Sequence, residues 1–136
     1  MENCLFCKII HKEIPADIVY DDEDTIAFLD IHPVNIGHVL VIPKKHIENI
    51  YGFDEDNINT VFTAVQKTAR AVKGGVNADG INIIMSNEKA AGQEVFHAHV
   101  HIIPRYETDN FAHWKRGREY EEGEAETVAV KISSQL

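Results

Sequence analysis

Hydrophobic and polar residues follow two different periods along this chain, and each period marks a kind of secondary structure. Apolar residues recur at three- and four-residue steps through 55–73, behind Asp54 as a candidate N-cap and before a Gly-Gly pair. This pattern predicts an amphipathic helix. A shorter helical pattern covers residues 4–11, and a weak one covers 128–136.

Runs of β-branched and apolar residues, bounded by turn residues, predict strands. The expected strands cover residues 18–20, 25–29, 38–42, 80–85 and 95–103. Most are linked as hairpins, with the long helix inserted between strand pairs. We therefore expect an α+β domain with an antiparallel sheet, because alternating βαβ units would give a parallel one. The sequence holds no glycine-rich phosphate loop of the Walker or Rossmann kind.

Composition narrows the class of protein. The 136 residues are 44% hydrophobic and 26% charged, and no run approaches the roughly 18 to 20 apolar residues of a membrane helix. The amino terminus lacks the basic and apolar regions of a secretory signal, so we expect a cytoplasmic protein. A net charge of -9 disfavours nucleic acids and anionic membranes as partners.

Three histidines, His97, His99 and His101, alternate with apolar residues in the last expected strand. Successive side chains of a strand point to opposite faces, so the three imidazoles are expected on one face. Neighbouring rings would lie about 6 to 7 Å apart and the outer two about 13 Å apart. All three together therefore cannot ligate one metal ion at about 2.1 Å.

Three interpretations of this histidine row remain open. The imidazoles are structural side chains with hydrogen-bond partners, or two of them hold a metal ion, or they perform acid, base or nucleophilic chemistry. Imidazole suits the third role, because its charge changes near neutral pH and its neutral form is a nucleophile. His99 has a neighbour on each side and is the expected attacker, with His101 placed to bind phosphoryl oxygens.

The segment 97–103 resembles the His-x-His-x-His-x-x signature of the histidine triad family, and the motifs around it resemble its Hint-like branch. The further matching motifs are residues 4–10, 12–15, 28–33, 37–47 and 91–96. The resemblance covers about residues 4–105 and leaves 106–136 as a variable tail. We expect a single domain over 1–136.

The resemblance implies a homodimer of HIT-like subunits, each with a sheet of about five strands. It implies binding of purine nucleoside monophosphates and cleavage of their phosphoramidates and related phosphoanhydrides. By similarity, His99 forms a covalent nucleotidyl intermediate that water resolves. His101 and Gln93 contact the phosphate, and His38 helps to position the nucleophile. No organic cofactor is expected.

The resemblance also predicts a nucleotide pocket. It assigns Asp30 to the ribose hydroxyls and an apolar group to the base, consisting of Ile14, Phe28 and Ile31. The loop before the triad adds four candidate contacts, Ser86, Asn87, Gly92 and Glu94. The family commonly has Asn where this chain has Ser86, so either Ser86 or Asn87 lines the site. The Glu94 carboxylate would repel a phosphate unless it points away.

Cys4 and Cys7 are the only cysteines, and a disulfide between them is not expected in a reducing compartment. A Cys-x-x-Cys pair is half of many zinc sites, or simply two buried thiols. By similarity to Gram-positive-type relatives, His46 and His97 complete a tetrahedral zinc site. Such a zinc ion would be structural, and His99 and His101 would remain for the chemistry.

Alternatives to a phosphoramidate-cleaving enzyme remain. One is a nucleotide-binding regulatory module in which turnover is incidental, and another is a hydrolase of dinucleoside polyphosphates. A third is a zinc-dependent hydrolase that uses the histidines as metal ligands.

Overall fold

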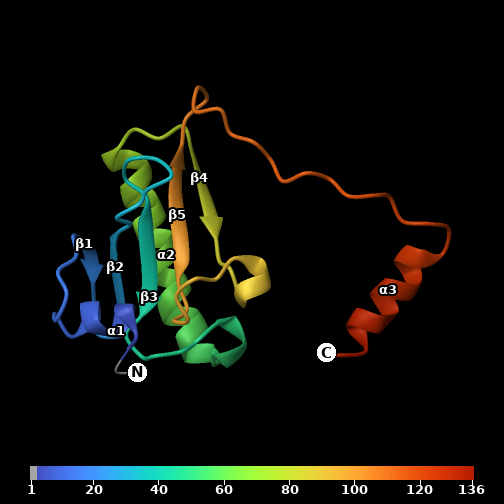
Figure 1. Cartoon of the computed structure of the whole chain (residues 1–136), viewed down its shortest axis with the longest axis horizontal. Helices are drawn as coiled ribbons and strands as arrows, with labels where there is room; N and C mark the ends of the chain where they lie inside the picture. Colours follow the sequence, from blue (N-terminus) through green and yellow to red (C-terminus); the bar gives the residue numbers. More distant parts are fainter. Residues whose placement is uncertain (1–2) are drawn as a thin grey trace.

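A computed structural model describes residues 3–136, and five antiparallel strands form its sheet in the order β1-β2-β3-β5-β4 (Figure 1). The strands are β1 (Ile18–Asp21), β2 (Thr25–Leu29), β3 (Val39–Pro43), β4 (Gly80–Ile84) and β5 (Val100–Arg105). The α-helices are α1 (Leu5–Ile10), α2 (Glu55–Gly75) and α3 (Glu124–Ser133). The expected α+β fold, with one long helix and short terminal helices, is confirmed.

Helix α2 covers one face of the sheet. It begins with a capping box, in which the Asp54 side chain accepts a hydrogen bond from the Asn57 N–H and the Asn57 side chain accepts one from the Asp54 N–H. Its buried side chains pack on strand residues of the first core cluster. That cluster comprises Ala27, Val39, Val41, Val61, Ala64, Val65, Val72, Val100 and Ile102. Burial of each valine or isoleucine side chain stabilises the fold by about 1.5 to 3 kcal/mol. The packing of α2 on this face therefore contributes much of the stability of the sheet.

The opposite face carries a second core cluster and the histidines. The cluster comprises Phe6, Ile26, Phe28, Leu40 and Ile42, with Phe6 supplied by α1. His101 is paired with Leu40 in the β3–β5 ladder, so its side chain lies on this face. The face that α2 does not cover therefore holds the candidate site.

The last strand differs from the prediction. We expected it over 95–103, but β5 begins at Val100, so His97 and His99 lie in the loop before it. The N–H of Ala98 donates to the carbonyl of Ile47 at 2.6 Å, outside the sheet ladder. This tertiary hydrogen bond engages the Ala98 N–H away from the sheet, so the segment before Val100 is not part of the ladder. Alternation in sequence could not reveal this contact.

Two further details depart from the sequence pattern. β5 continues through Pro104, which is paired with Ile81, to Arg105. A short 3-10 helix, Lys89–Ala91, lies in the loop expected before the triad, and another, Ile50–Gly52, lies between β3 and α2. None of the helices in residues 3–136 is long and apolar enough to cross a membrane.

Gly37 enters β3 with φ +98, and a Cβ there would lie 2.9 Å from Val76 Cγ1. Replacement Gly37→Ala is therefore expected to lower the free energy of unfolding by more than about 1 kcal/mol. The control Gly74→Ala has no atom within 4 Å of its new Cβ. It should leave stability unchanged or raise it by about 0.5 to 1 kcal/mol, because it replaces a helical glycine. Urea unfolding measures both, and equal stability of the two variants would contradict the argument.

Candidate functional site

The ring of His99 is buried and is held by the backbone of its own loop. Its Nδ1 lies 2.7 Å from the carbonyl oxygen of His97. A carbonyl only accepts, so Nδ1 must carry the proton, and Nε2 of the neutral ring keeps a free lone pair. The backbone thus selects the tautomer in which His99 Nε2 is a nucleophile.

A chain of hydrogen bonds sets the tautomer of His101 in turn. The N–H of Val34 donates to Nδ1 of His38 at 3.1 Å, so His38 Nε2 carries a proton and donates it to Nδ1 of His101 at 2.9 Å. His101 Nε2 is then an N–H donor. The ring centroids of His99 and His101 lie 5.0 Å apart. A nucleophilic nitrogen therefore neighbours an N–H donor, which suits attack on an anionic phosphoryl group.

Burial keeps the rings of His38 and His101 neutral. It lowers the pKa of His38 and lowers that of His101 to about 4, with the nearby His99 and His38 adding to the shift of His101. Asp30 opposes both shifts, and its Oδ2 lies 3.7 Å from His38 Nε2. Both imidazoles are neutral at neutral pH, as the hydrogen-bond chain requires.

Asp30, His38 and His101 also place one possible metal-ligand atom each within 4.8 Å of one another. Here His38 Nε2 and His101 Nδ1 share a hydrogen bond. Two nitrogens joined by one proton do not offer two lone pairs to a cation. The geometry at this point favours the hydrogen-bonded pair over a catalytic metal.

Gln93 braces the loop before the histidines. Its Oε1 accepts from the Glu88 N–H at 2.8 Å, and its Nε2 donates to the carbonyls of Glu48 and Val95 at 2.6 and 3.1 Å. The buried amide thus joins two backbone groups of its own loop, at Glu88 and Val95, to the distant carbonyl of Glu48. Its predicted contact with phosphate stays a prediction, whereas its role in shaping the loop is evident.

The other residues predicted in the loop of Gln93 differ in their contacts and exposure. Asn87 Oδ1 accepts from the Ile50 N–H at 2.9 Å, so its carbonyl oxygen is engaged. Ser86 Oγ lies 4.0 Å from the position of a Cβ on Gly92, which has φ +93. Ser86 therefore faces the turn at Gly92, and Glu94 is exposed.

The three residues predicted for the base pocket differ in burial. Phe28 belongs to the second core cluster, Ile14 is half-buried, and Ile31 is 84% exposed. Asp30 Oδ1 accepts from the His32 N–H at 2.8 Å, which shapes the turn that presents Ile31. An exposed isoleucine beside a partly buried aspartate is available to a ligand.

Phe6 is a site residue that the sequence interpretation missed. Its ring packs edge-on against His99, His97 and Phe28, at centroid distances of 5.2, 5.9 and 5.5 Å. Its position between Cys4 and Cys7 at helical spacing was the available signal. The helix that carries the cysteines thus also packs against His99.

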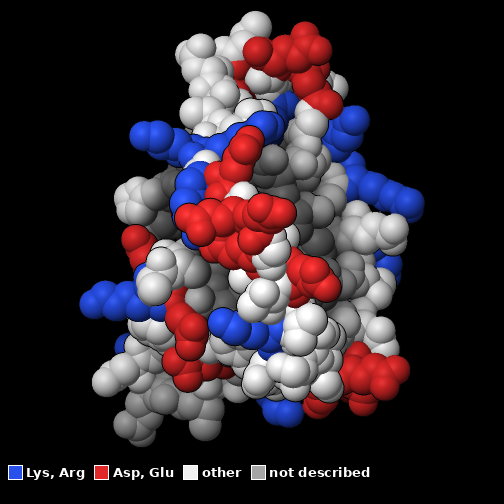
Figure 2. Space-filling model, turned by 90° about the vertical axis from the view of Figure 1, so that its right-hand side faces the viewer, with Lys and Arg blue, Asp and Glu red and all other residues white. Residues whose placement is uncertain are grey.

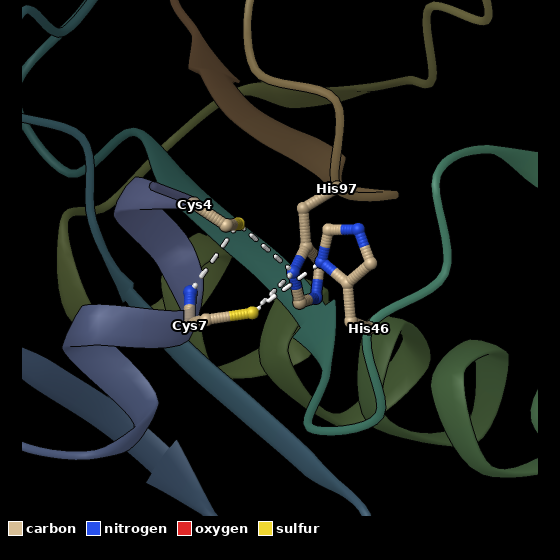
Figure 3. A group of neighbouring side chains, drawn as sticks. All are labelled: Cys4, Cys7, His46 and His97. Carbon is tan, nitrogen blue, oxygen red and sulfur yellow. Dashed lines mark hydrogen bonds between the residues drawn. The ribbon is translucent and has the colours of Figure 1, made fainter. Parts of the chain in front are cut away.

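The four predicted metal ligands, Cys4, Cys7, His46 and His97, converge between α1, the loop after β3 and the loop before β5 (Figure 3). Cys4 Sγ lies 3.5 Å from His97 Nδ1, and Cys7 Sγ lies 3.3 Å from His46 Nδ1. Tetrahedral ligands at about 2.3 Å for sulfur and 2.1 Å for nitrogen would be about 3.5 Å apart. The cluster has the donor set and the size of a tetrahedral zinc site.

His97 connects this cluster with His99. Its ring is fully buried, and its Nε2–H donates to the carbonyl of Pro43 at 2.8 Å, which leaves the Nδ1 lone pair facing both cysteines. Its own carbonyl accepts the Nδ1–H of His99. The three imidazoles therefore do not form one functional row, because His97 turns to the cysteines while His99 and His101 stay together.

A pocket of about 470 Å³ lies over β4 and β5, on the sheet face that carries His101. Ile84 lines it and is paired with His101 in the ladder, and Ile103 is the next residue of β5 on this face. Phe111 and Trp114, beyond the sheet, close it from outside. The sequence interpretation did not identify this pocket, since its walls come from separate parts of the chain.

A family model for the HIT domain matches residues 11–108. This chain belongs to the HIT, or histidine triad, family. Protein hit from Bacillus subtilis is 46% identical over 99% of this chain and 95% of its own length. An adenylylsulfatase from Arabidopsis thaliana is 36% identical over 79% of this chain, which spans about half of that protein.

Solved HIT structures share the fold. A Streptococcus mutans protein matches with a TM-score of 0.93 and 43% identity, over 99% of this chain and 86% of its own. A zinc-bound histidine triad protein from Mycobacterium smegmatis matches at 0.78 and 34%, over 99% of both chains. A histidine triad nucleotide-binding protein from Candida albicans matches at 0.86 and 29%, over 98% of this chain and 97% of its own.

Acid should destabilise the fold through His101. In the unfolded chain this residue takes up a proton near its ordinary pKa of 6.5, whereas the folded residue stays neutral to about pH 4. The contribution of neutral His101 to the free energy of unfolding is complete above pH 6.5. It is lost as the pH falls towards 4, and it is on the order of 1 to 3 kcal/mol. Urea unfolding at pH 7 and at pH 4.5 measures how much free energy of unfolding is lost on acidification. This loss should be smaller for His101→Gln than for the wild type. The exposed-site control His32→Gln should keep the wild-type loss, and equal losses in all three would contradict the assignment.

Proposed function

We propose that this HIT protein is a nucleotide-binding hydrolase or transferase that cleaves purine nucleoside phosphoramidates and related phosphoanhydrides. The observation that carries the proposal is the hydrogen bond from His99 Nδ1–H to the carbonyl of His97, at 2.7 Å. It leaves Nε2 as a nucleophile beside the N–H donor of His101. Names of relatives add support, since one is a nucleotide-binding protein and another an adenylylsulfatase.

In the proposed reaction, His99 Nε2 attacks phosphorus and forms a P–N bond. The bond to the leaving group breaks, and a protonated phosphoramidate nitrogen departs as the amine. His101 Nε2–H donates to a phosphoryl oxygen as charge develops. The ring of His99 becomes positive, and the His97 carbonyl stabilises it through Nδ1–H. Water then attacks phosphorus and releases a proton to solvent, the bond from phosphorus to His99 Nε2 breaks, and the nucleoside monophosphate is released.

The remaining predicted residues form the nucleotide pocket in this proposal. Asp30 binds the ribose hydroxyls. Ser86, Gly92 and the brace Gln93 shape the phosphate side, with Glu94 pointing to solvent. The base lies among apolar side chains, namely Ile14, Phe28 and Ile31.

The active form is proposed to be a homodimer. β4 is an edge strand, and its Ile83 is about half exposed. On α2, Ile58 and Phe62 are exposed one turn apart. An unpaired edge strand and exposed apolar side chains are what a second subunit covers.

Zinc is proposed for the cluster of two cysteines and two histidines. It would be held by Cys4, Cys7, His46 and His97 and would supply structural stability by joining α1 to the sheet. The zinc-bound relative from Mycobacterium smegmatis supports this choice of metal. No step of the reaction passes through it.

Replacement His99→Ala should abolish turnover of an adenosine phosphoramidate, with kcat/KM reduced by at least about 10³-fold, because the nucleophile is lost. Rapid quench and mass spectrometry of the wild type should find AMP attached to His99. The control His32→Ala changes an exposed histidine and should retain activity. Wild-type turnover in His99→Ala would disprove the proposal, and tight nucleotide binding without turnover of any phosphoramidate would indicate a regulatory module.

Removal of the metal is expected to weaken the fold. Purified protein should contain about one zinc per chain, and Cys7→Ser should contain much less and melt at a lower temperature, since a ligand is lost. Elemental analysis and thermal unfolding measure both. The control His11→Ala alters an exposed histidine at the end of α1 and should keep its zinc. Full zinc content in Cys7→Ser would contradict the assignment.

A further inference from the structure

The 30–38 loop connects β2 to β3 and carries Asp30 at one end and His38 at the other. The N–H of Asp30 donates to the His38 carbonyl at 2.9 Å, and the N–H of His38 donates to the Asn35 carbonyl at 3.0 Å. The N–H of Val34 donates to Nδ1 of the His38 ring. The positions of the protons on His38 and His101 therefore depend on where this loop holds residues 34 and 35.

The side chain of Asn35 attaches this loop to the end of β5. Its Nδ2 donates to the carbonyl of Pro104 and to Oδ2 of Asp109, both at 2.8 Å, across 69 and 74 residues of sequence. A carbonyl and a carboxylate only accept, so the amide must present its nitrogen to them. Val34 and Ile36, on either side of Asn35, are 57% and 80% exposed. The attachment of this part of the loop therefore depends mainly on Asn35.

Asp109, the second partner of Asn35, is an unusual carboxylate in this acidic chain. Figure 2 shows acidic side chains gathered on the surface of one side of the molecule. Within residues 3–136, every Asp and Glu except Asp30, Asp109 and Glu124 is exposed. The Asp109 side chain is the most buried of these three, since it is 9% exposed. Its hydrogen bonds must therefore offset the cost of withdrawing a charge from water.

Four hydrogen bonds satisfy that carboxylate. Arg105 Nε and Nη2 donate to its two oxygens at 3.0 and 2.9 Å, and the Tyr106 N–H donates at 2.9 Å, beside the bond from Asn35. The hydrogen bonds from Arg105, followed by the one from the Tyr106 N–H, lower the pKa of Asp109 to about 2. Arg105 is itself paired with Gly80 in the β4–β5 ladder. The acceptor that holds Asn35 is thus charged at neutral pH and fixed to the sheet.

We infer that Asn35 and Asp109 are positioning residues for the proposed reaction, because they hold the loop that sets the protons of the His38–His101 pair. Asp109 holds Asn35, and Asn35 holds the backbone next to Val34. The Val34 N–H then keeps the proton of His38 on Nε2, from which it is donated to His101. This inference rests on the proposed function and adds to it two residues outside the predicted nucleotide pocket.

Release of the loop would allow a second arrangement of the same protons. Without the Val34 N–H, Nδ1 of His38 can carry the proton, and its Nε2 can accept from the Nδ1–H of His101. His101 Nε2 would then direct a lone pair at the phosphoryl group instead of an N–H. A lone pair repels an anionic oxygen, so the donor that stabilises the transition state would be lost although both rings stay in place.

Nitrogen-15 NMR of the imidazoles tests this inference in the full chain without substrate. At neutral pH we expect the wild type to carry its protons on Nε2 of His38 and of His101. In Asn35→Ala and in Asp109→Ala, a second population with protonated Nδ1 should appear for both rings. The control Asp79→Ala removes an exposed carboxylate that accepts the Glu107 N–H, and it should keep the wild-type pattern. Wild-type patterns in both variants, with cooperative thermal unfolding, would overturn the inference.

Kinetics with an adenosine phosphoramidate provide a second measurement. Loss of the His101 donor acts on the transition state, so Asn35→Ala should lower kcat at least about tenfold and change KM less than about twofold. Asp79→Ala should retain the wild-type kcat. A change confined to KM in Asn35→Ala would overturn the inference.

A double variant tests whether the two positioning residues act through their shared contact. If they do, Asn35→Ala combined with Asp109→Ala should lower kcat no further than the more severe single variant, whereas additive losses would overturn the inference. AMP labelling of His99 is measured on the same samples. Altered protonation in the variants, together with a wild type that is never labelled, supports the positioning of the imidazoles and counts against the proposed reaction.

Discussion

The structure depends on His97, whose ring contacts the cysteine cluster and whose backbone carbonyl contacts His99. The ring of His97 places one nitrogen against the cysteines and the other on the Pro43 carbonyl, while its backbone carbonyl accepts the proton of His99. A bond to a metal ion at His97 would therefore restrain the carbonyl that selects the tautomer of His99. Stability of the amino-terminal region and orientation of the His99 ring are thus linked through a single residue.

One face of the sheet carries apolar packing against α2, and the other carries the buried imidazole rings. Packing of α2 on valines of β3 and β5 supplies much of the apolar core, so the other face can bear buried polar rings. Those rings are costly to bury unless each nitrogen has a partner. The chain from the Val34 N–H through His38 to His101 provides such partners, and burial keeps the imidazoles neutral. The same hydrogen bonds that offset burial define which ring nitrogens donate and which keep a free lone pair.

Beyond Asp109 the organisation changes. Residues up to 109 contain two core clusters, whereas residues 110–136 contain one internal ion pair, between Arg118 and Glu124, and a helix α3 with no buried residue. Phe111 and Trp114 of this segment line the pocket beside His101. Variation in these two residues would therefore alter the surroundings of the candidate site without disturbing the core.

Local pattern determined much of this protein. Helical periodicity located α2, and β-branched runs located the strands. The motifs around the histidines identified the family and predicted four metal ligands, Cys4, Cys7, His46 and His97, which the fold brings together. Tertiary contacts decided the rest. The hydrogen bond from the Ala98 N–H to the Ile47 carbonyl accompanies the start of β5 at Val100 instead of residue 95. Phe6 packs against His99, which lies more than ninety residues away in the sequence. Gln93 likewise braces its loop through the distant Glu48 carbonyl. Periodicity reports which face a residue prefers, whereas the partner that it meets depends on how distant segments pack.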